Sequence, residues 1–117
     1  MNIRLIGVPL WYGCDNPGTE QAFDCFCKAG VKELAERCGL RVNGISSVHV
    51  PEDTDKHLDP TMEYLNGTVA ACRNLEQAVK ESVENGDFPL TLGGDHSLGI
   101  GSVAGISHHT IDIFRKD

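Results

Sequence analysis

Residues 91–102 hold the side chains with the clearest capacity for chemistry. They read TLGGDHSLGIGS, so Asp95 and His96 come directly after a Gly-Gly pair at the end of an apolar run. A neutral imidazole can bind a transition metal, and a neighbouring carboxylate can orient the ring or cap a following helix. Gly93 and Gly94 allow positive φ and a close backbone approach. A plain strand-to-helix turn, a metal site, a phosphate cradle and a hydrolytic centre all remain open on these residues alone.

The glycines that follow offer a nucleotide-binding interpretation. Residues 99–105 read GIGSVAG, close to the fingerprint G-x-G-x-x-G of dinucleotide-binding turns. That fingerprint opens the turn itself, whereas this stretch begins seven residues after Leu92, the last apolar residue of the preceding run. The acidic residue that should follow about 20 positions later is also missing. We therefore expect these glycines to allow tight packing of a helix on a sheet.

Cysteines and further histidines are weaker candidates for metal ligands. Cys25 and Cys27 lack a second pair at zinc spacing, so we expect small buried apolar side chains there. His108 and His109 are adjacent, and in an extended tail they would point to opposite faces and could not chelate one ion together. Asp112 lies between two isoleucines, as a carboxylate at a strand end would. We expect no substitute metal site from these tail residues.

Composition excludes several classes of partner. The chain has 117 residues, with 10 basic against 17 acidic side chains and a formal net charge of −7. Nucleic acids and anionic membrane surfaces require clustered Lys and Arg, so neither is expected as the main partner. No apolar run approaches the roughly 20 residues of a membrane span, and no secretory signal is recognisable. Five cysteines, an odd number, suit reduced thiols in the cytoplasm.

The elements that must position the Gly-Gly turn follow from hydrophobic patterning. Apolar runs predict strands at 3–9 and 88–92, and a weaker one from 40 towards 50, while apolar residues at three- and four-residue steps predict helices. The predicted helices cover residues 20–38, with Thr19 as N-cap and Gly39 as stop, 62–83, ended by Asn85-Gly86, and 97–107. Such alternation predicts an α/β fold, a parallel sheet with helices on both faces. The loops at 11–19, 51–60 and 93–97 should then share the carboxyl edge, where ligands gather.

The Gly-Gly turn resembles the first metal-ligand motif of the arginase (ureohydrolase) family. The motif is FPLTLGGDHSLGIGSVAG at residues 88–105, and residues 75–86 look like the arginase helix that leads into it. The family's opening pattern is similar to IGVP at 6–9, Gly13, GTE at 18–20 and KAG at 28–30. The resemblance covers most of residues 3–107, and it is closer to arginase than to agmatinase or formiminoglutamase.

The resemblance implies a three-layer α-β-α fold with a parallel sheet, of which residues 1–117 would be the N-terminal portion of a single arginase-like domain. It also implies two Mn²⁺ ions at the carboxyl edge, bridged by a hydroxide whose pKa the cations lower. That hydroxide attacks the guanidinium carbon of arginine and yields urea and ornithine. His96 aligns with a manganese ligand, and Asp95 carries over only as its neighbour beside Gly93 and Gly94. No catalytic or substrate-binding residue carries over.

The chain also departs from the family. The Asp-x-His-x-Asp and Asp-x-Asp motifs that supply the other metal ligands are absent, and residues 107–117 do not align. The Gly-Pro that follows the family's opening Gly-x-Glu is replaced by Gln21-Ala22-Phe23. We therefore expect an incomplete C-terminal half, an incomplete manganese site and little or no activity of the chain alone. Agmatinase- or formiminoglutamase-type specificity remains an alternative. So does a non-catalytic binding or assembly module, with self-association of copies through an exposed sheet edge.

Overall fold

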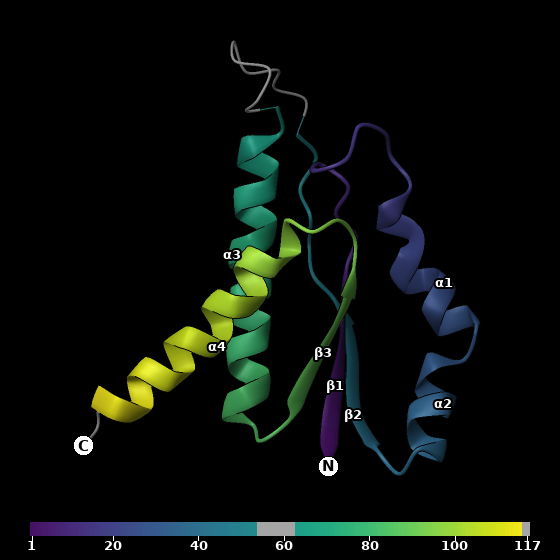
Figure 1. Ribbon diagram of the computed structural model, residues 1–117, viewed down its shortest axis with the longest axis vertical. Helices are drawn as coiled ribbons and strands as arrows, with labels where there is room; N and C mark the ends of the chain where they lie inside the picture. The colour runs from purple at the N-terminus through teal and green to yellow at the C-terminus, as the bar shows by residue number, and fades with distance from the viewer. Residues whose placement is uncertain (54–62, 116–117) are drawn as a thin grey trace.

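A computed structural model describes residues 1–53 and 63–115, which form a three-layer arrangement (Figure 1). Three parallel strands in the order β2-β1-β3 make the middle layer. The first half of the chain consists of β1 (Asn2–Val8), the 3₁₀ turn η1 (Thr19–Gln21), α1 (Ala22–Lys28), α2 (Val31–Arg37) and β2 (Arg41–Ser47). The second half consists of α3 (Leu65–Glu84), β3 (Phe88–Gly93) and α4 (Leu98–Arg115). The predicted α-β-α architecture is confirmed.

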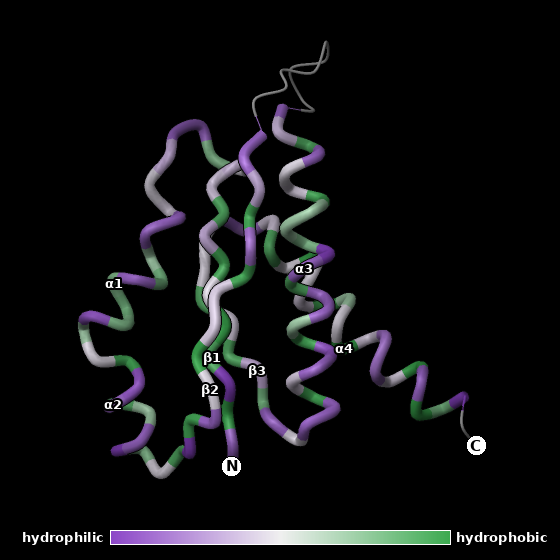
Figure 2. The backbone as a smooth tube through the Cα atoms, turned by 180° about the vertical axis from the view of Figure 1, so that it is seen from behind, coloured by the Kyte–Doolittle hydropathy of each residue, from purple (hydrophilic) through white to green (hydrophobic). Residues whose placement is uncertain are grey.

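The two helical layers cover opposite faces of the sheet. Figure 2, seen from behind, shows α1 and α2 on one side and α3 and α4 on the other, with apolar and polar residues alternating along the helices. β1 is central, so both of its faces are buried. Ile6 and Val8 pack in a core with Leu75 of α3, whereas Leu5 packs with Phe23 of α1. A parallel strand buried on both faces needs the near-continuous apolar sequence that β1 has.

The long helix expected over residues 20–38 is wrong, because the chain forms two short helices there. Gly30 separates α1 from α2 with a φ of +95°, a conformation outside the helical region that glycine adopts without strain. Thr19 does not cap a helix. Its hydroxyl donates instead to the Leu10 carbonyl, at 2.9 Å. Gly39, at φ +87°, lies just beyond α2 and ends it as predicted.

The second strand includes residues 43–47, which the sequence pattern indicated only weakly as a strand. Ile3 pairs with Val42 and Arg4 with Gly44, so Asn43 is an extra residue that bulges from the ladder. The Asn43 amide donates to a carboxylate oxygen of Asp87, at 2.8 Å. This bond connects the β2 bulge with the residue that precedes β3, and it gives a polar side chain a partner that a local pattern cannot reveal.

The last helix is longer than predicted. α4 continues to Arg115, whereas the periodicity predicted an end near residue 107 and an extended tail. Its glycines were predicted to pack on the sheet, but they pack on α3. Gly101 and Gly105 lie against the backbone carbonyls of Cys72 and Glu76. Among the described residues, no helix has the length and hydropathy to cross a membrane.

Candidate functional site

The Gly-Gly turn lies where β3 ends, against the loop that follows β1. Gly94 has a φ of +77°, and a Cβ there would lie 2.5 Å from the Val8 carbonyl oxygen. A Cβ at Gly93 would overlap the Leu98 side chain. Gly94 is therefore required for the chain to leave the strand and cross the end of β1, as the sequence predicted for a close backbone approach, whereas a Cβ at Gly93 would require the flexible Leu98 side chain to move.

Asp95 joins this turn to the loop after β1. The side chain is buried, with one carboxylate oxygen accepting from the Gly13 amide at 2.8 Å and the other from the Ser97 amide at 2.7 Å. Its own amide donates to the Leu10 carbonyl, at 3.0 Å. Of the roles open to Asp95 from the sequence, the structure favours a structural one: both oxygens are held by backbone donors, just ahead of α4.

His96 follows Asp95 and is exposed at the same edge. It lines a shallow hollow of about 250 Å³ together with Gly94, Leu98 and Gly99. Within the described residues, the imidazole makes no hydrogen bond. An exposed imidazole at the carboxyl end of a parallel strand is placed where ligands bind in open α/β sheets.

Cys72 contacts the turn from the neighbouring helix. Its thiol donates to the Ser97 carbonyl, at 3.3 Å, and burial raises the pKa of the thiol above its ordinary value of 9.0. The thiol therefore stays protonated and holds the turn against α3. Cys72 is the one buried cysteine of the five. The buried position expected for Cys25 is wrong, because that residue is exposed on α1.

The loops at 11–19 and 51–60 were also expected at this edge, and the Tyr12 side chain connects them to each other. The Tyr12 hydroxyl donates to the Pro51 carbonyl at 2.7 Å and accepts from the Asp53 amide at 3.0 Å. Asp53 in turn accepts from the amide of Gly67 in α3, at 2.7 Å. The Tyr12 ring stacks on Tyr64, with ring centroids 4.9 Å apart. The remainder of the predicted loop, residues 54–60, lies outside the described residues.

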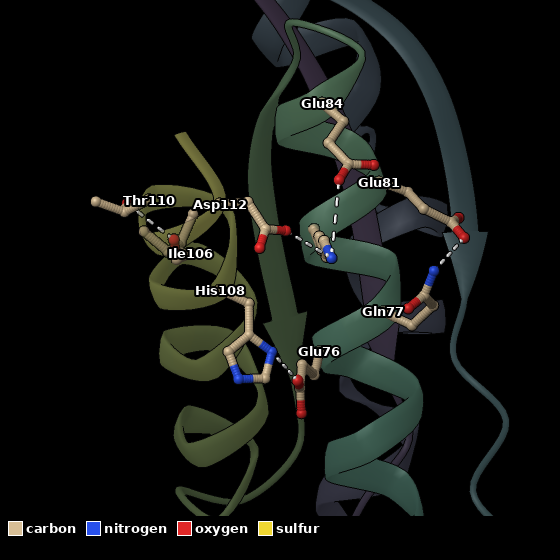
Figure 3. Close-up of polar contacts among 9 residues, drawn as sticks. Glu76, Gln77, Glu81, Glu84, Ile106, His108, Thr110 and Asp112 are labelled. Atoms are coloured by element: carbon tan, nitrogen blue, oxygen red, sulfur yellow. Dashed lines mark hydrogen bonds and ion pairs between the residues drawn. The ribbon is translucent and has the colours of Figure 1, made fainter. Parts of the chain in front are cut away.

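The tail candidates are not part of this edge (Figure 3). His108 Nδ1 contacts a carboxylate oxygen of Glu76, and Asp112 forms an ion pair with Lys80 at 3.0 Å, so both connect α4 to α3. The idea of a strand-end carboxylate at Asp112 is wrong, because the residue is helical. With about 1.5 Å of rise per residue, His108 lies roughly 15 Å along α4 from its start.

The described residues do not fit a pair of manganese ions. No three His, Cys, Asp or Glu side chains within residues 1–53 and 63–115 come together as a ligand set. Asp95 has both oxygens engaged with amides, which leaves His96 as a single nitrogen donor. Mn²⁺ favours several oxygen ligands, so one imidazole does not hold even one such ion firmly.

Comparisons with known proteins decide the family. The arginase family model matches residues 1–115. The chain belongs to the arginase family. It is 31% identical to an arginase of Brevibacillus brevis over 113 residues and 33% identical to one of Bacillus caldovelox over 109 residues, in both cases with 92% of this chain covered. The predicted membership is thereby confirmed.

Solved arginases share the fold. The arginase of Bacillus caldovelox superposes with a TM-score of 0.81 at 32% identity, and that of Bacillus cereus with 0.80 at 33% identity. The chain covers 36% of each of these structures and 36% of the curated relatives named above. It thus spans about a third of an arginase chain, in agreement with the expectation that it corresponds to a portion of the family domain.

Proposed function

We propose that this chain supplies the His96 corner of a manganese-dependent arginase, an enzyme of the cytoplasm that hydrolyses the guanidino group of arginine to urea and ornithine. We further propose that the 117 residues alone do not perform the reaction. The observation that carries the proposal is the geometry of the turn. Asp95 is held by the amides of Gly13 and Ser97, so the turn is rigid and His96 extends from it at the sheet edge.

The described residues contribute more to the position of His96 than to the chemistry of the reaction. A ligand histidine has to be presented in a fixed orientation, because loose geometry lowers metal affinity. The Gly93-Gly94 crossing, the Asp95 bonds and the Cys72 contact fix the backbone on both sides of His96. The described residues provide no carboxylate ligands for a manganese pair, so such ligands would have to come from elsewhere. Because the described residues do not hold a pair of metal ions, we assign them no step of the hydrolysis.

The test is urea release from L-arginine by the purified chain after incubation with excess Mn²⁺. A His96→Ala variant is the matched control; agmatine replaces arginine in a parallel reaction, and release of formamide from formiminoglutamate is measured in another. We expect neither urea nor formamide above the control with any of the substrates. Manganese-dependent turnover that disappears in His96→Ala would show that the chain, or an assembly of its copies, completes the site, and would contradict the proposed inactivity.

A second candidate function is a non-catalytic assembly module of the same family. It is favoured by the outer edge of β3, which pairs only with β1 among the described strands, and by the exposed apolar residues of α4. Self-association that leaves arginine untouched, with or without Mn²⁺, supports this candidate over the first.

A further inference from the structure

Tyr12 and Gly13 are neighbours in the loop after β1, and they bond to different parts of the carboxyl edge. The Tyr12 hydroxyl bonds to the loop after β2, where it donates to the Pro51 carbonyl and accepts from the Asp53 amide. The Gly13 amide donates to the Asp95 carboxylate in the turn after β3, at 2.8 Å. Because one planar peptide unit joins the two residues, a shift of Tyr12 also moves Gly13. The loop after β1 therefore connects the other two loops.

Both ends of this set of contacts lie on α3. At one end, the Asp53 carboxylate accepts from the amide of Gly67 at 2.7 Å and so satisfies a donor that the first turn of a helix leaves unpaired. At the other end, the Cys72 thiol donates to the Ser97 carbonyl. Gly67 and Cys72 lie roughly 7.5 Å apart along the helix axis. We call this closed path the edge network, and its members are Gly67, Asp53, Tyr12, Gly13, Asp95, Ser97 and Cys72.

Two glycines of the edge network allow contacts that are too close for a larger residue. A Cβ at Gly67 would lie 2.5 Å from a ring carbon of Tyr12. A Cβ at Gly13 would lie 2.6 Å from the Ser97 hydroxyl oxygen and 2.7 Å from a carboxylate oxygen of Asp95. Gly67 occupies a helical position in spite of the low helix propensity of glycine. Packing this close at both positions leaves the members of the network little room to move independently.

Two further aromatic side chains hold the ring of Tyr12. It stacks on Tyr64 with an angle of 18° between the ring planes, and the Trp11 ring lies 5.3 Å from Tyr12 and 5.2 Å from Tyr64, centroid to centroid. Among the described residues other than glycine, Tyr64 alone has a positive φ, of +58°. A bulky residue in this conformation is strained, and surrounding contacts have to offset the strain. The ring contacts do so, and they hold the Tyr12 hydroxyl in place between Pro51 and Asp53.

His96 lies between two turn residues that the edge network holds. Asp95 is buried with both carboxylate oxygens hydrogen-bonded, and Ser97 is bonded through its amide and its carbonyl. His96 itself is exposed and takes part in none of these contacts. Its position is therefore set by the backbone on either side. A displacement of Tyr12 reaches that backbone through Gly13 and Asp95.

We propose that Tyr12 is a positioning residue for His96. The Tyr12 hydroxyl fixes the loop after β1, and that loop fixes the turn after β3 through Gly13 and Asp95. The proposal rests on the proposed function for the use made of His96, whereas the coupling itself needs no metal ion. Since coupling between two sites is reciprocal, a change at Asp95 also loosens the contacts of Tyr12.

Amide hydrogen exchange of the metal-free chain tests the proposal with Tyr12→Phe, which keeps the ring and removes the hydroxyl. Amides of the central strand β1 report overall unfolding and serve as the reference. Relative to them, exchange at Gly13 and Ser97 should become about tenfold faster, which is the change in an opening equilibrium that one ordinary hydrogen bond produces. Tyr64→Phe removes a hydroxyl from the other ring of the same stack and is the matched control. It should change exchange at these amides by less than about twofold.

Three results of the exchange experiment would overturn the proposal. Faster exchange at Asp53 without a change at Gly13 would mean that Tyr12 holds only the loop after β2. Equal acceleration in the Tyr12 variant and its control, or equal acceleration of loop and β1 amides, would show a general loosening. The reciprocal variant Asp95→Ala should accelerate exchange at Asp53 and Gly67, which the Asp95 side chain does not contact. Unchanged exchange at both would contradict the coupling.

The imidazole signals of His96 in nuclear magnetic resonance give a readout that a purely structural role of Tyr12 would not move. In Tyr12→Phe these signals should shift, while those of His108 and His109 on α4 stay in place. Unshifted His96 signals would contradict the proposal. Because no metal is added, a negative result here leaves the proposed metal binding by His96 untouched. A failure of His96 to bind metal would equally leave the coupling in place, so the two proposals are judged separately.

Discussion

Gly101 of α4 lies directly against the backbone of Cys72 in α3. A Cβ built at Gly101 would be 2.4 Å from the Cys72 carbonyl oxygen, and one at Gly105 would be 2.7 Å from the Glu76 carbonyl oxygen. Since these neighbours are backbone atoms, they cannot move aside. The close crossing of α3 and α4 therefore depends on glycine at both positions, and it orients the turn that carries His96.

Gly101→Ala is expected to destabilise the fold by about 1–3 kcal/mol, the usual cost of overpacking a close contact. Gly99→Ala is the matched control within the same helix. A Cβ at Gly99 meets nothing within 4 Å, so its higher helix propensity should leave stability equal or raise it by less than about 1 kcal/mol. Urea unfolding followed by circular dichroism measures both, and equal stability of the two variants would contradict the packing described.

Asp95→Ala is expected to cost about 2–4 kcal/mol, because it leaves the amides of Gly13 and Ser97 without their charged acceptor. Amide exchange at Gly13 should accelerate, which reports the loss of that bond independently of global stability. Asp15→Ala removes an exposed carboxylate from the same loop and should change stability by less than about 0.5 kcal/mol. Unchanged exchange at Gly13 in the Asp95 variant would exclude the role assigned to this carboxylate.

Tyr12→Phe keeps the aromatic ring but removes the hydroxyl that bridges Pro51 and Asp53. The loss of two hydrogen bonds should lower the free energy of unfolding by about 1–2 kcal/mol. Tyr64→Phe is the control, since its ring makes the same stack and its hydroxyl has no hydrogen bond among the described residues. If the two variants unfold at the same urea concentration, the bridging role of Tyr12 is wrong.

The raised pKa of Cys72 makes stability decrease in alkaline solution. The unfolded thiol loses its proton near the ordinary value of 9.0, whereas burial keeps the folded thiol protonated to higher pH. The unfolded state then binds fewer protons, so stability falls as pH rises above about 9. Cys72→Ala should flatten this part of the pH–stability curve. A curve of the same slope in Cys72→Ala would attribute the alkaline loss to other groups.

The rate at which each cysteine reacts should follow its exposure to solvent. Exposed Cys25 and Cys38 are expected to react with an aromatic disulfide reagent at rates typical of free thiols, and buried Cys72 much more slowly. Mass spectrometry of the labelled peptides identifies each site. Labelling of Cys72 as fast as of Cys25 would mean that the α3–α4 crossing opens readily in solution.

The sequence was most informative where local pattern and covalent geometry decide the structure. Alternating apolar segments predicted the parallel sheet, and adjacent Gly93 and Gly94 predicted a close backbone crossing, which is what the Val8 carbonyl requires. The loops after β1, β2 and β3 share one edge because parallel strands end together. The presence of His96 at that edge followed from the same argument.

What the sequence did not predict depends on partners far away in the chain. Tyr12 and Pro51 are separated by 39 positions, and Asn43 and Asp87 by 44, so no local pattern indicates these bonds. The glycines of α4 allow a close approach to any neighbour, and only the tertiary arrangement selects α3. The helical conformation of the tail could have been predicted, because no glycine or proline interrupts residues 106–115.

We propose that His96 is the residue of this chain that binds metal, and nuclear magnetic resonance of histidine side chains tests this proposal. Small additions of Mn²⁺ broaden the imidazole signals of residues that the ion approaches, and His49, His108 and His109 serve as internal controls. We expect the His96 signals to broaden first, at metal concentrations that leave these three unaffected. Equal broadening of all the histidines, or earlier broadening of another one, would contradict it.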